Sequence, residues 1–182
     1  MRSIIEWFKY KGWFIFDLPY FIKEKQYTIG LELGAKGGRS MYYMLKENKN
    51  LNLTGIDLWE NLEGSAYKNN QKNEFRCKRK LRRFSDRTTL IKGDAKNIVN
   101  EFPDSSFDFI YYDLQCRNML DFHHQMISLY LPKIKNGGIL IGRDFRQFRE
   151  TFYNLGFEEE DFLNCKMGER ISPRLEYLVI KK

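Results

Sequence analysis

The stretch LELGAKGGRS, residues 31–40, places an apolar run directly before a turn that is rich in glycine. Glycine adopts backbone angles that other residues avoid, and it allows a ligand to approach the main chain closely. A turn of this kind between a strand and a helix also directs backbone N–H groups towards whatever lies above it. The stretch therefore predicts a strand, a tight turn and a helix, with a ligand over the turn.

The length of 182 residues suits one domain over 1–182, with an N-terminal helical and aromatic extension over 1–26 and a core over 27–182. Charged residues and Pro19 interrupt the extension, which therefore matches neither a signal peptide nor a membrane span. A helix and loop packed on the domain are favoured over an interfacial segment or a lid. The three cysteines fit no metal or disulfide spacing, so we expect reduced thiols in a cytoplasmic protein.

The net charge of +7 is concentrated in one segment, residues 68–87, which contains nine lysines or arginines and two acidic residues. Cys77, Leu81 and Phe84 follow one another in it at helical spacing. We expect a helix that packs through this apolar stripe. Its basic face is either solvated, which is favoured, or binds an anion such as a phosphate, an acidic glycan or a nucleic acid.

Predicted strands alternate with predicted helices along the chain, a pattern that indicates a parallel sheet covered by helices on both faces. The expected strands are 27–33, 51–57, 88–94, 107–113 and 139–142. The expected helices between and after them include 38–48, 95–102, 119–134 and 146–155, with a turn at 136–138.

The C-terminal part breaks this alternation. Residues 156–168 and 173–182 look like two strands close together, separated by a turn. Adjacent strands with a short connection form an antiparallel hairpin. We therefore expect a single α/β domain with a mostly parallel, seven-stranded sheet and a C-terminal antiparallel hairpin.

An acidic residue stands near the C-terminal end of each predicted parallel strand, where open α/β sheets bind their ligands. The five are Glu32, Asp57, Asp94, Asp113 and Asp144. Each alone could cap a helix or a turn, but five in equivalent positions indicate a shared site.

The glycine turn reads G-A-K-G-G and lacks the glycine spacing that a dinucleotide pyrophosphate needs. Asp57 is placed to accept hydrogen bonds from ribose hydroxyls, and Asp94 to accept one from an amine such as adenine N6. These acids favour a nucleoside that carries positive charge over one that carries phosphate.

Taken in order, LELGAKGGRS, GIDLWE, KGDA, FDFIYYD and NGGILIGRDF resemble the motifs of class I S-adenosylmethionine-dependent methyltransferases, above all the small-molecule O-methyltransferase-like branch. The resemblance spans residues 27–181 and implies a Rossmann-like fold with S-adenosylmethionine as cofactor. The resemblance also assigns residues to each part of the cofactor. It implies that Glu32 and Gly34 contact the methionine group, that Gly38 and Ser40 shape the turn, and that Asp57 binds the ribose. It further implies that Leu58 and Trp59 lie beside the adenine, Asp94 and Ala95 at the adenine edge, and Asp113 below the sulfonium.

Methyl transfer requires an acceptor held in line with the methyl group and a route for its proton. Asp113 and Asp144 are the candidates for positioning the substrate or acting as base. Because some members of the resembling branch bind a divalent metal there, both are also candidate Mg²⁺ ligands. Arg143 stands where that branch often has histidine; it would repel a cation, and it could instead clamp an anionic acceptor. His123 lies on the apolar side of a predicted helix and is expected to be a packing residue.

The sequence therefore predicts a methyltransferase acting on an oxygen of a small molecule or sugar, with an anionic acceptor favoured by the basic segment. Nucleic-acid methylation is one alternative: the charge supports it, but no Asn-Pro-Pro-Tyr-like motif is present. A non-catalytic S-adenosylmethionine-binding or assembly protein is the other, because the histidines of the resembling branch are missing.

Overall fold

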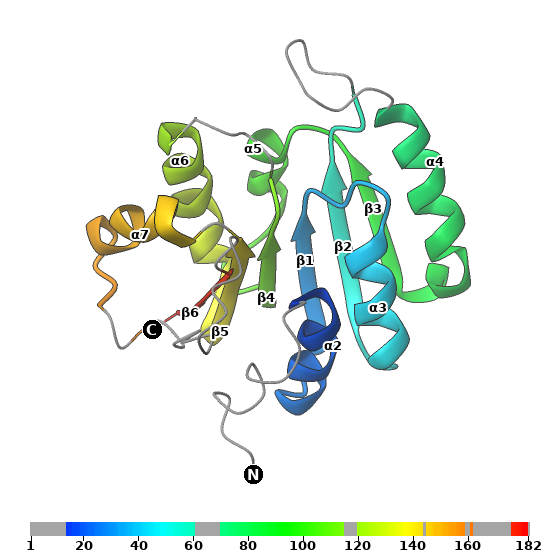
Figure 1. Cartoon of the computed structure of the whole chain (residues 1–182), viewed down its shortest axis with the longest axis horizontal. Coiled ribbons are helices and arrows are strands. Elements are labelled where there is room, and N and C mark those ends of the chain that lie inside the picture. The colour runs from blue at the N-terminus through cyan, green and yellow to red at the C-terminus, as the bar shows by residue number, and fades with distance from the viewer. Residues whose placement is uncertain are drawn as a thin grey trace.

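The structure is a computed structural model, which describes residues 14–60, 70–114, 120–143, 145–158, 161 and 176–181. Six strands form one sheet in the order β3-β2-β1-β4-β5-β6 (Figure 1). Their bounds are β1 Ile29–Leu33, β2 Asn52–Asp57, β3 Thr88–Lys92, β4 Phe107–Tyr112, β5 Ile134–Arg143 and β6 Glu176–Ile180.

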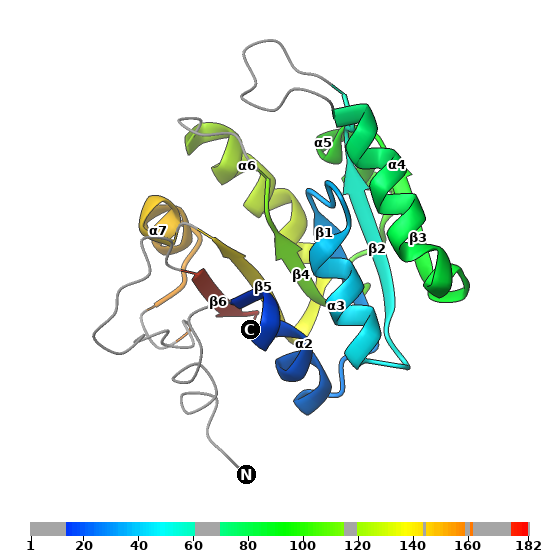
Figure 2. The same ribbon diagram turned by 45° about the vertical axis from the view of Figure 1, so that its right-hand side comes forward.

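Helices cover both faces of this sheet (Figure 2). The α-helices are α2 Phe14–Glu24, α3 Arg39–Glu47, α4 Asn70–Leu81, α5 Ala95–Ile98, α6 Leu120–Tyr130 and α7 Phe145–Asn154. Three 3₁₀ helices continue α4, α5 and α6 as η1 Arg82–Arg87, η2 Val99–Glu101 and η3 Leu131–Lys133.

The first five strands are parallel, as predicted, and β6 runs antiparallel to β5. The described sheet thus has six strands and not the predicted seven. Within the segment predicted as the first arm of the hairpin, residues 156–158 are irregular and Asp161 lies in a 3₁₀ turn. The rest of that arm lies outside the described residues, so the predicted hairpin is not shown, and the described C-terminal strand is β6, antiparallel to β5.

The turn predicted at residues 136–138 is wrong, because β5 runs through it. The pairing of β4 with β5 shifts in register between Phe107 and Phe109, and Gly137 has a φ of 75°. The N–H of Gly137 donates to the carbonyl of Lys181 at 2.8 Å. The Asn-Gly-Gly sequence therefore provides a bulge within a strand and does not end one.

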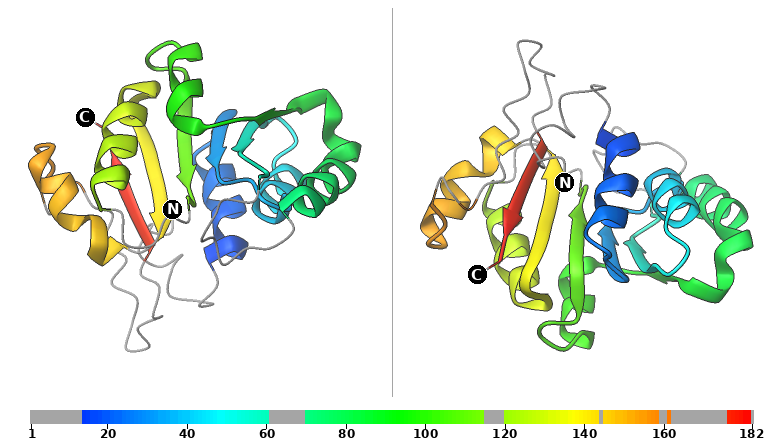
Figure 3. Two further views of the ribbon diagram at one scale, coloured as in Figure 1. Left: turned by 90° about the horizontal axis from the view of Figure 1, so that it is seen from above. Right: turned by 90° about the horizontal axis from the view of Figure 1, so that it is seen from below.

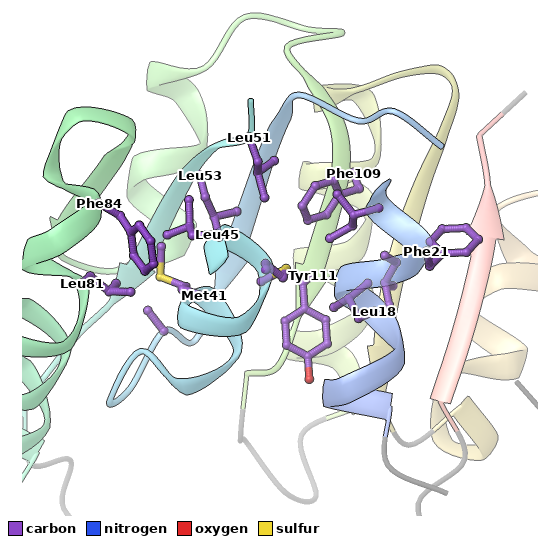
Figure 4. Packing of buried hydrophobic residues seen from close by; sticks show 14 of the residues in the cluster. Leu18, Phe21, Met41, Leu45, Leu51, Leu53, Leu81, Phe84, Phe109 and Tyr111 are labelled. Atoms are coloured by element: carbon purple, nitrogen blue, oxygen red, sulfur yellow. The ribbon is translucent and has the colours of Figure 1, made fainter. Parts of the chain in front are cut away.

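Two hydrophobic clusters lie on opposite faces of the sheet. One packs beneath α2, α3 and α4 (Figure 4), and the other beneath α5, α6 and α7. The view from above in Figure 3 places α2 and α3 on one side and α5 and α6 on the other. Tyr111 and Tyr112 are neighbours on β4, and each is buried in a different cluster, because strand side chains alternate between faces.

Helix α2 packs against α3 within the first cluster, through Leu18, Phe21 and Ile22. Pro19 lies inside α2 and does not end it. The side-chain amide of Asn48, at the end of α3, donates to the carbonyl of Pro19 at 2.8 Å and so joins the two helices. Among the helices of the described residues, none is long and apolar enough to cross a membrane.

Asp108 links neighbouring strands at the edge of the sheet where the parallel strands begin. Its carboxylate accepts from the backbone N–H groups of Thr28 and Ile29, at 2.7 and 2.9 Å, and from the ammonium of Lys135 at 2.6 Å. Burial alone would raise the pKa of Asp108, but the hydrogen bonds from Lys135, Thr28 and Ile29 outweigh it and lower that pKa. This network holds together the starts of β1, β4 and β5.

Candidate functional site

The buried carboxylate of Glu32 joins the end of β1 to the start of α3. Glu32 is 1% exposed, and it accepts a hydrogen bond from the hydroxyl of Ser40, in the first turn of α3. A carboxylate is costly to bury without such partners. The two residues are neighbours in space, and they fix the position of the glycine turn that lies between them.

The glycine turn is folded tightly against the ends of β2 and β4. Gly34 has a φ of +92°, and a Cβ there would lie 2.5 Å from the carbonyl oxygen of Asp113. Gly38 has a φ of +67°, and a Cβ there would lie 2.8 Å from the sulfur of Cys77. Both positions therefore require glycine. A Cβ at Gly37, by contrast, would meet nothing within 4 Å, so the turn faces open space there.

The backbone N–H groups of this turn are largely used within the protein. Those of Gly34 and Ala35 donate to the carbonyl of Ile56, at 2.9 and 3.1 Å, and that of Gly38 donates to the carbonyl of Ala35 at 2.7 Å. The sequence suggested that the turn directs such groups at a ligand. In the structure these three instead attach the turn to β2 and to itself, and they give the turn a fixed shape.

Asp57, at the end of β2, accepts hydrogen bonds from both loops at the carboxyl edge. The N–H of Lys36 donates to one carboxylate oxygen at 2.7 Å, and the N–H of Trp59 donates to the other at 2.8 Å. Each oxygen of a carboxylate has a further lone pair, so the group still has capacity to accept from hydroxyls. Asp57 is thus held in a defined position at the edge where the ribose contact was predicted.

Trp59 supports the loop from within. Its ring is 1% exposed, in the cluster beneath α3 and α4, and its indole N–H donates to the carbonyl of Lys36 at 2.7 Å. Trp59 and Lys36 have φ values of 45° and 46°, a conformation that is uncommon for residues other than glycine. This placement points the ring into the core, while the preceding Leu58 is half-buried at the same edge.

Asp94 and Ala95 open helix α5, next to the end of β3. Asp94 caps this helix, with its carboxylate accepting from the N–H of Lys96 at 2.9 Å. The carbonyl of the buried Ala95 accepts from the hydroxyl of Tyr130 at 2.7 Å, and burial raises the pKa of that hydroxyl. Asp94 therefore acts as a helix cap, as any single acid in this position could, and it does so through one of its two carboxylate oxygens.

Asp113 directly follows β4, and its N–H donates to the carbonyl of Leu33 at 2.9 Å. Tyr112 and Gly142 are register partners on β4 and β5, so Asp113 and Arg143 directly follow a paired position on neighbouring strands. Asp144 lies outside the described residues. In the part of the chain that the structure describes, no three His, Cys, Asp or Glu residues are grouped as they would be around a metal ion.

His123 is a buried residue of α6, as predicted, and lies on the face that meets the sheet. Its Nδ1 and the hydroxyl of Tyr112 lie 2.5 Å apart. The sequence placed His123 among the packing residues but gave no sign of this partner, because the contact depends on how α6 is seated on β4.

Cys77 is a buried free cysteine against the glycine turn. Burial raises the pKa of its thiol to about 12, and the charges of Glu32 and Asp57 add to this. The thiol is therefore protonated and acts as a small apolar group. The other two cysteines, Cys116 and Cys165, lie outside the described residues.

Comparison with known proteins adds the family. Residues 31–145 match a family described as a methyltransferase domain. No curated protein sequence matches the chain.

Three solved structures have a similar fold. A Staphylococcus aureus protein assigned as a caffeoyl-CoA O-methyltransferase is 15% identical with a TM-score of 0.65, over 92% of this chain and 82% of the other. A Klebsiella pneumoniae protein assigned as an O-methyltransferase is 16% identical with a TM-score of 0.64, over 94% and 80%. An S-adenosylhomocysteine-bound methyltransferase from Podospora anserina is 14% identical with a TM-score of 0.64, over 100% and 80%.

Proposed function

Because the chain belongs to the methyltransferase domain family, we propose that it transfers the methyl group of S-adenosylmethionine to an oxygen of a small molecule or sugar, and that an anionic acceptor is favoured. The observation that carries this proposal is the pair of joined loops at the carboxyl edge, where Asp57 is fixed by the N–H groups of Lys36 and Trp59. The solved O-methyltransferase-like structures support oxygen as the acceptor atom through their fold.

The residues at this edge fit S-adenosylmethionine. Asp57 has lone pairs left to accept from ribose hydroxyls, and the space at Gly37 leaves the turn open to a ligand. When bound, the sulfonium of the cofactor supplies a methyl group that is already activated for displacement. The residues proposed to hold the cofactor, directly or by shaping its loops, are Glu32, Gly34, Gly38, Ser40, Asp57, Leu58, Trp59, Asp94, Ala95 and Asp113.

On the acceptor side, we assign Asp113 and Asp144 to positioning the acceptor hydroxyl and accepting its proton. Arg143 would bind a negative group of the acceptor, since a guanidinium binds carboxylate or phosphate in a bidentate manner. The register of β4 and β5 supports this assignment, because it puts Asp113 and Arg143 directly after paired residues. Measuring the turnover of charged and neutral acceptors by the Arg143→Ala variant tests this assignment. We expect turnover of the charged acceptor to fall more than turnover of the neutral one, and equal decreases would contradict the assignment.

A magnesium ion held by Asp113 and Asp144 stays a prediction. It would orient the acceptor hydroxyl and lower its pKa. Arg143, directly before Asp144 in the sequence, opposes this prediction, because its positive charge repels a cation. If turnover survives EDTA unchanged, the ion has no role in the reaction.

Calorimetry with S-adenosylmethionine and S-adenosylhomocysteine tests the proposed function first. Asp57→Asn should lower the affinity for both ligands by roughly tenfold or more, because a hydrogen bond to a charged group contributes about 1.5–3 kcal/mol. Asp104→Asn, a change at an exposed acid far from this edge, is the matched control and should leave binding unchanged. Absence of binding by the unaltered protein at millimolar ligand would favour an assembly protein.

Transfer of a labelled methyl group then identifies the acceptor class. A panel of anionic and neutral small molecules and sugars should include a substrate, whereas transfer to RNA or DNA alone would favour the nucleic-acid alternative. Binding without transfer to any acceptor would favour a non-catalytic cofactor-binding protein.

We also propose a cytoplasmic location, consistent with the buried, reduced Cys77.

A further inference from the structure

One surface of α4 and η1 carries positive charge that the described acidic residues do not pair with. Six of its lysines and arginines are exposed, and within the described residues none of them forms an ion pair. This set, here called the basic face, consists of Lys72, Arg76, Arg79, Lys80, Arg82 and Arg83.

The other cations of the same segment have structural partners. Lys78 pairs with Glu74 at 2.7 Å. Arg87 donates to the carbonyls of Leu45 and Asn48, both at 2.6 Å, and so caps the end of α3. Fold stability therefore accounts for these two charges. On the basic face, Arg83 lies 5.3 Å from the ring centroid of Phe84, but none of the six cations is paired with an acidic residue that the structure describes.

Like charges crowd one another on this face. The pKa of Lys80 is lowered by burial, and the charges of Arg39 and Arg76 lower it further. Such crowding has a cost unless an anion lies among the cations. A negatively charged partner would relieve it.

The geometry of the face suits a linear partner. Lys72, Arg76 and Arg79 are spaced i, i+4 and i+7 on α4, so they form a row on one side of the helix roughly 10 Å long. A row of this kind follows a chain of phosphates better than it surrounds one small anion.

An exposed aromatic ring lies beside this row. Phe75 is 65% exposed, more than any other large hydrophobic residue that the structure describes as exposed, and the guanidinium of Arg79 lies 5.8 Å from its ring centroid. Exposed aromatic rings in basic grooves are the surfaces on which unpaired bases stack. An anionic membrane fits less well, because insertion needs an apolar helix face, and Cys77 and Leu81 of that face are buried against the domain.

We propose that the basic face and Phe75 bind single-stranded nucleic acid, with phosphates along Lys72, Arg76 and Arg79 and a base stacked on Phe75. Helix α4 packs on the glycine turn through Cys77, and it forms the outer flank of the domain beyond α3 (Figure 1). Lys72, Arg76 and Arg79 lie on the side of α4 opposite to Cys77, so the bound strand would run along the outer side of this helix. This proposal concerns binding, and it stands whether or not the nucleic acid accepts the methyl group.

Fluorescence anisotropy with a labelled single strand of about 15 nucleotides tests it. The triple variant Lys72→Ala, Arg76→Ala, Arg79→Ala should bind at least tenfold more weakly. Its plot of log affinity against log salt should be shallower by roughly 2, because each lost phosphate contact removes about 0.7. The matched control, Lys23→Ala, Lys49→Ala, Lys96→Ala, removes the same charge from exposed positions elsewhere and should bind within about twofold of the unaltered protein.

Phe75→Leu separates stacking from insertion into lipid. Leucine keeps an apolar side chain but has no ring face, so single-strand affinity should fall roughly tenfold. Circular dichroism should show that each variant is folded. The proposal is overturned if the unaltered protein does not bind the strand at low salt, if both triple variants lose affinity equally, or if Phe75→Leu binds normally. It is also overturned if vesicles with anionic lipid bind more tightly than the strand.

Discussion

The indole N–H of Trp59 donates to the carbonyl of Lys36 at 2.7 Å, and this bond ties the loop after β2 to the glycine turn after β1. The N–H of Lys36 in turn donates to Asp57, two residues before Trp59. Each of the two loops thus holds the other, and both Lys36 and Trp59 keep a left-handed backbone conformation within this arrangement. The candidate cofactor site is therefore shaped by contacts made before any ligand arrives.

We expect Trp59→Phe to loosen this arrangement. The change keeps an aromatic ring but removes the indole N–H that donates to the carbonyl of Lys36, which should lower the free energy of unfolding by about 1–3 kcal/mol. Affinity for S-adenosylhomocysteine should fall as well, because the turn and Asp57 lose a common support. Urea denaturation and calorimetry measure the two effects. A loss of affinity with unchanged stability would instead indicate direct contact between the indole and the ligand.

The two glycines of the turn should respond differently to alanine. Gly34→Ala places a Cβ 2.5 Å from the Asp113 carbonyl at a φ of +92°, so we expect it to destabilise the protein by more than about 1–2 kcal/mol. At Gly37 the added methyl meets nothing within 4 Å, and Gly37→Ala should change stability by less than about 0.5 kcal/mol. Denaturation midpoints of the pair make the comparison, and similar losses would contradict the described turn.

Much of the fold could be predicted from the sequence. The strands from 27 to 113 are apolar runs with an acid at or near the C-terminal end, and such runs separated by helical segments indicate a parallel sheet. The turn at residues 136–138 was wrongly predicted, because glycine supplies the same left-handed backbone to a bulge as to a turn. Pairing of β5 with β4 and β6 decides whether the glycines form a bulge or a turn. A local sequence pattern holds no information on this pairing.

The candidate site was predictable in its position but not in its internal contacts. The carboxyl ends of parallel strands meet at one edge, so Glu32, Asp57 and Asp113 could be grouped from their places in the sequence. Trp59 is buried and has a φ of 45°, and its residue type suggests neither property. The residue type at Lys36 likewise does not indicate the two hydrogen bonds that its backbone makes with Asp57 and Trp59.

Asp108 should make stability depend on acid pH. Its pKa is lower in the folded state than in the unfolded chain, so as pH falls the unfolded state takes up the proton first. The stabilisation is therefore complete above the unfolded-state pKa and is lost as pH falls through the folded-state pKa. Asp108→Asn should lower stability at neutral pH by roughly 1–2 kcal/mol and flatten the dependence on acid pH. Urea denaturation across the acid range measures both, and an equally steep dependence in the variant would contradict the assignment.

Cys77 should resist alkylation while the protein is folded. Its thiol is buried against Gly38, and burial raises its pKa to about 12, so near pH 8 almost none of it is thiolate. A variant with Cys116→Ser and Cys165→Ser isolates this residue. Iodoacetamide should label it slowly in buffer and rapidly in urea, with mass spectrometry as the readout. Rapid labelling of the folded variant would mean that α4 separates from the glycine turn, and with it the support that α4 gives to the candidate site.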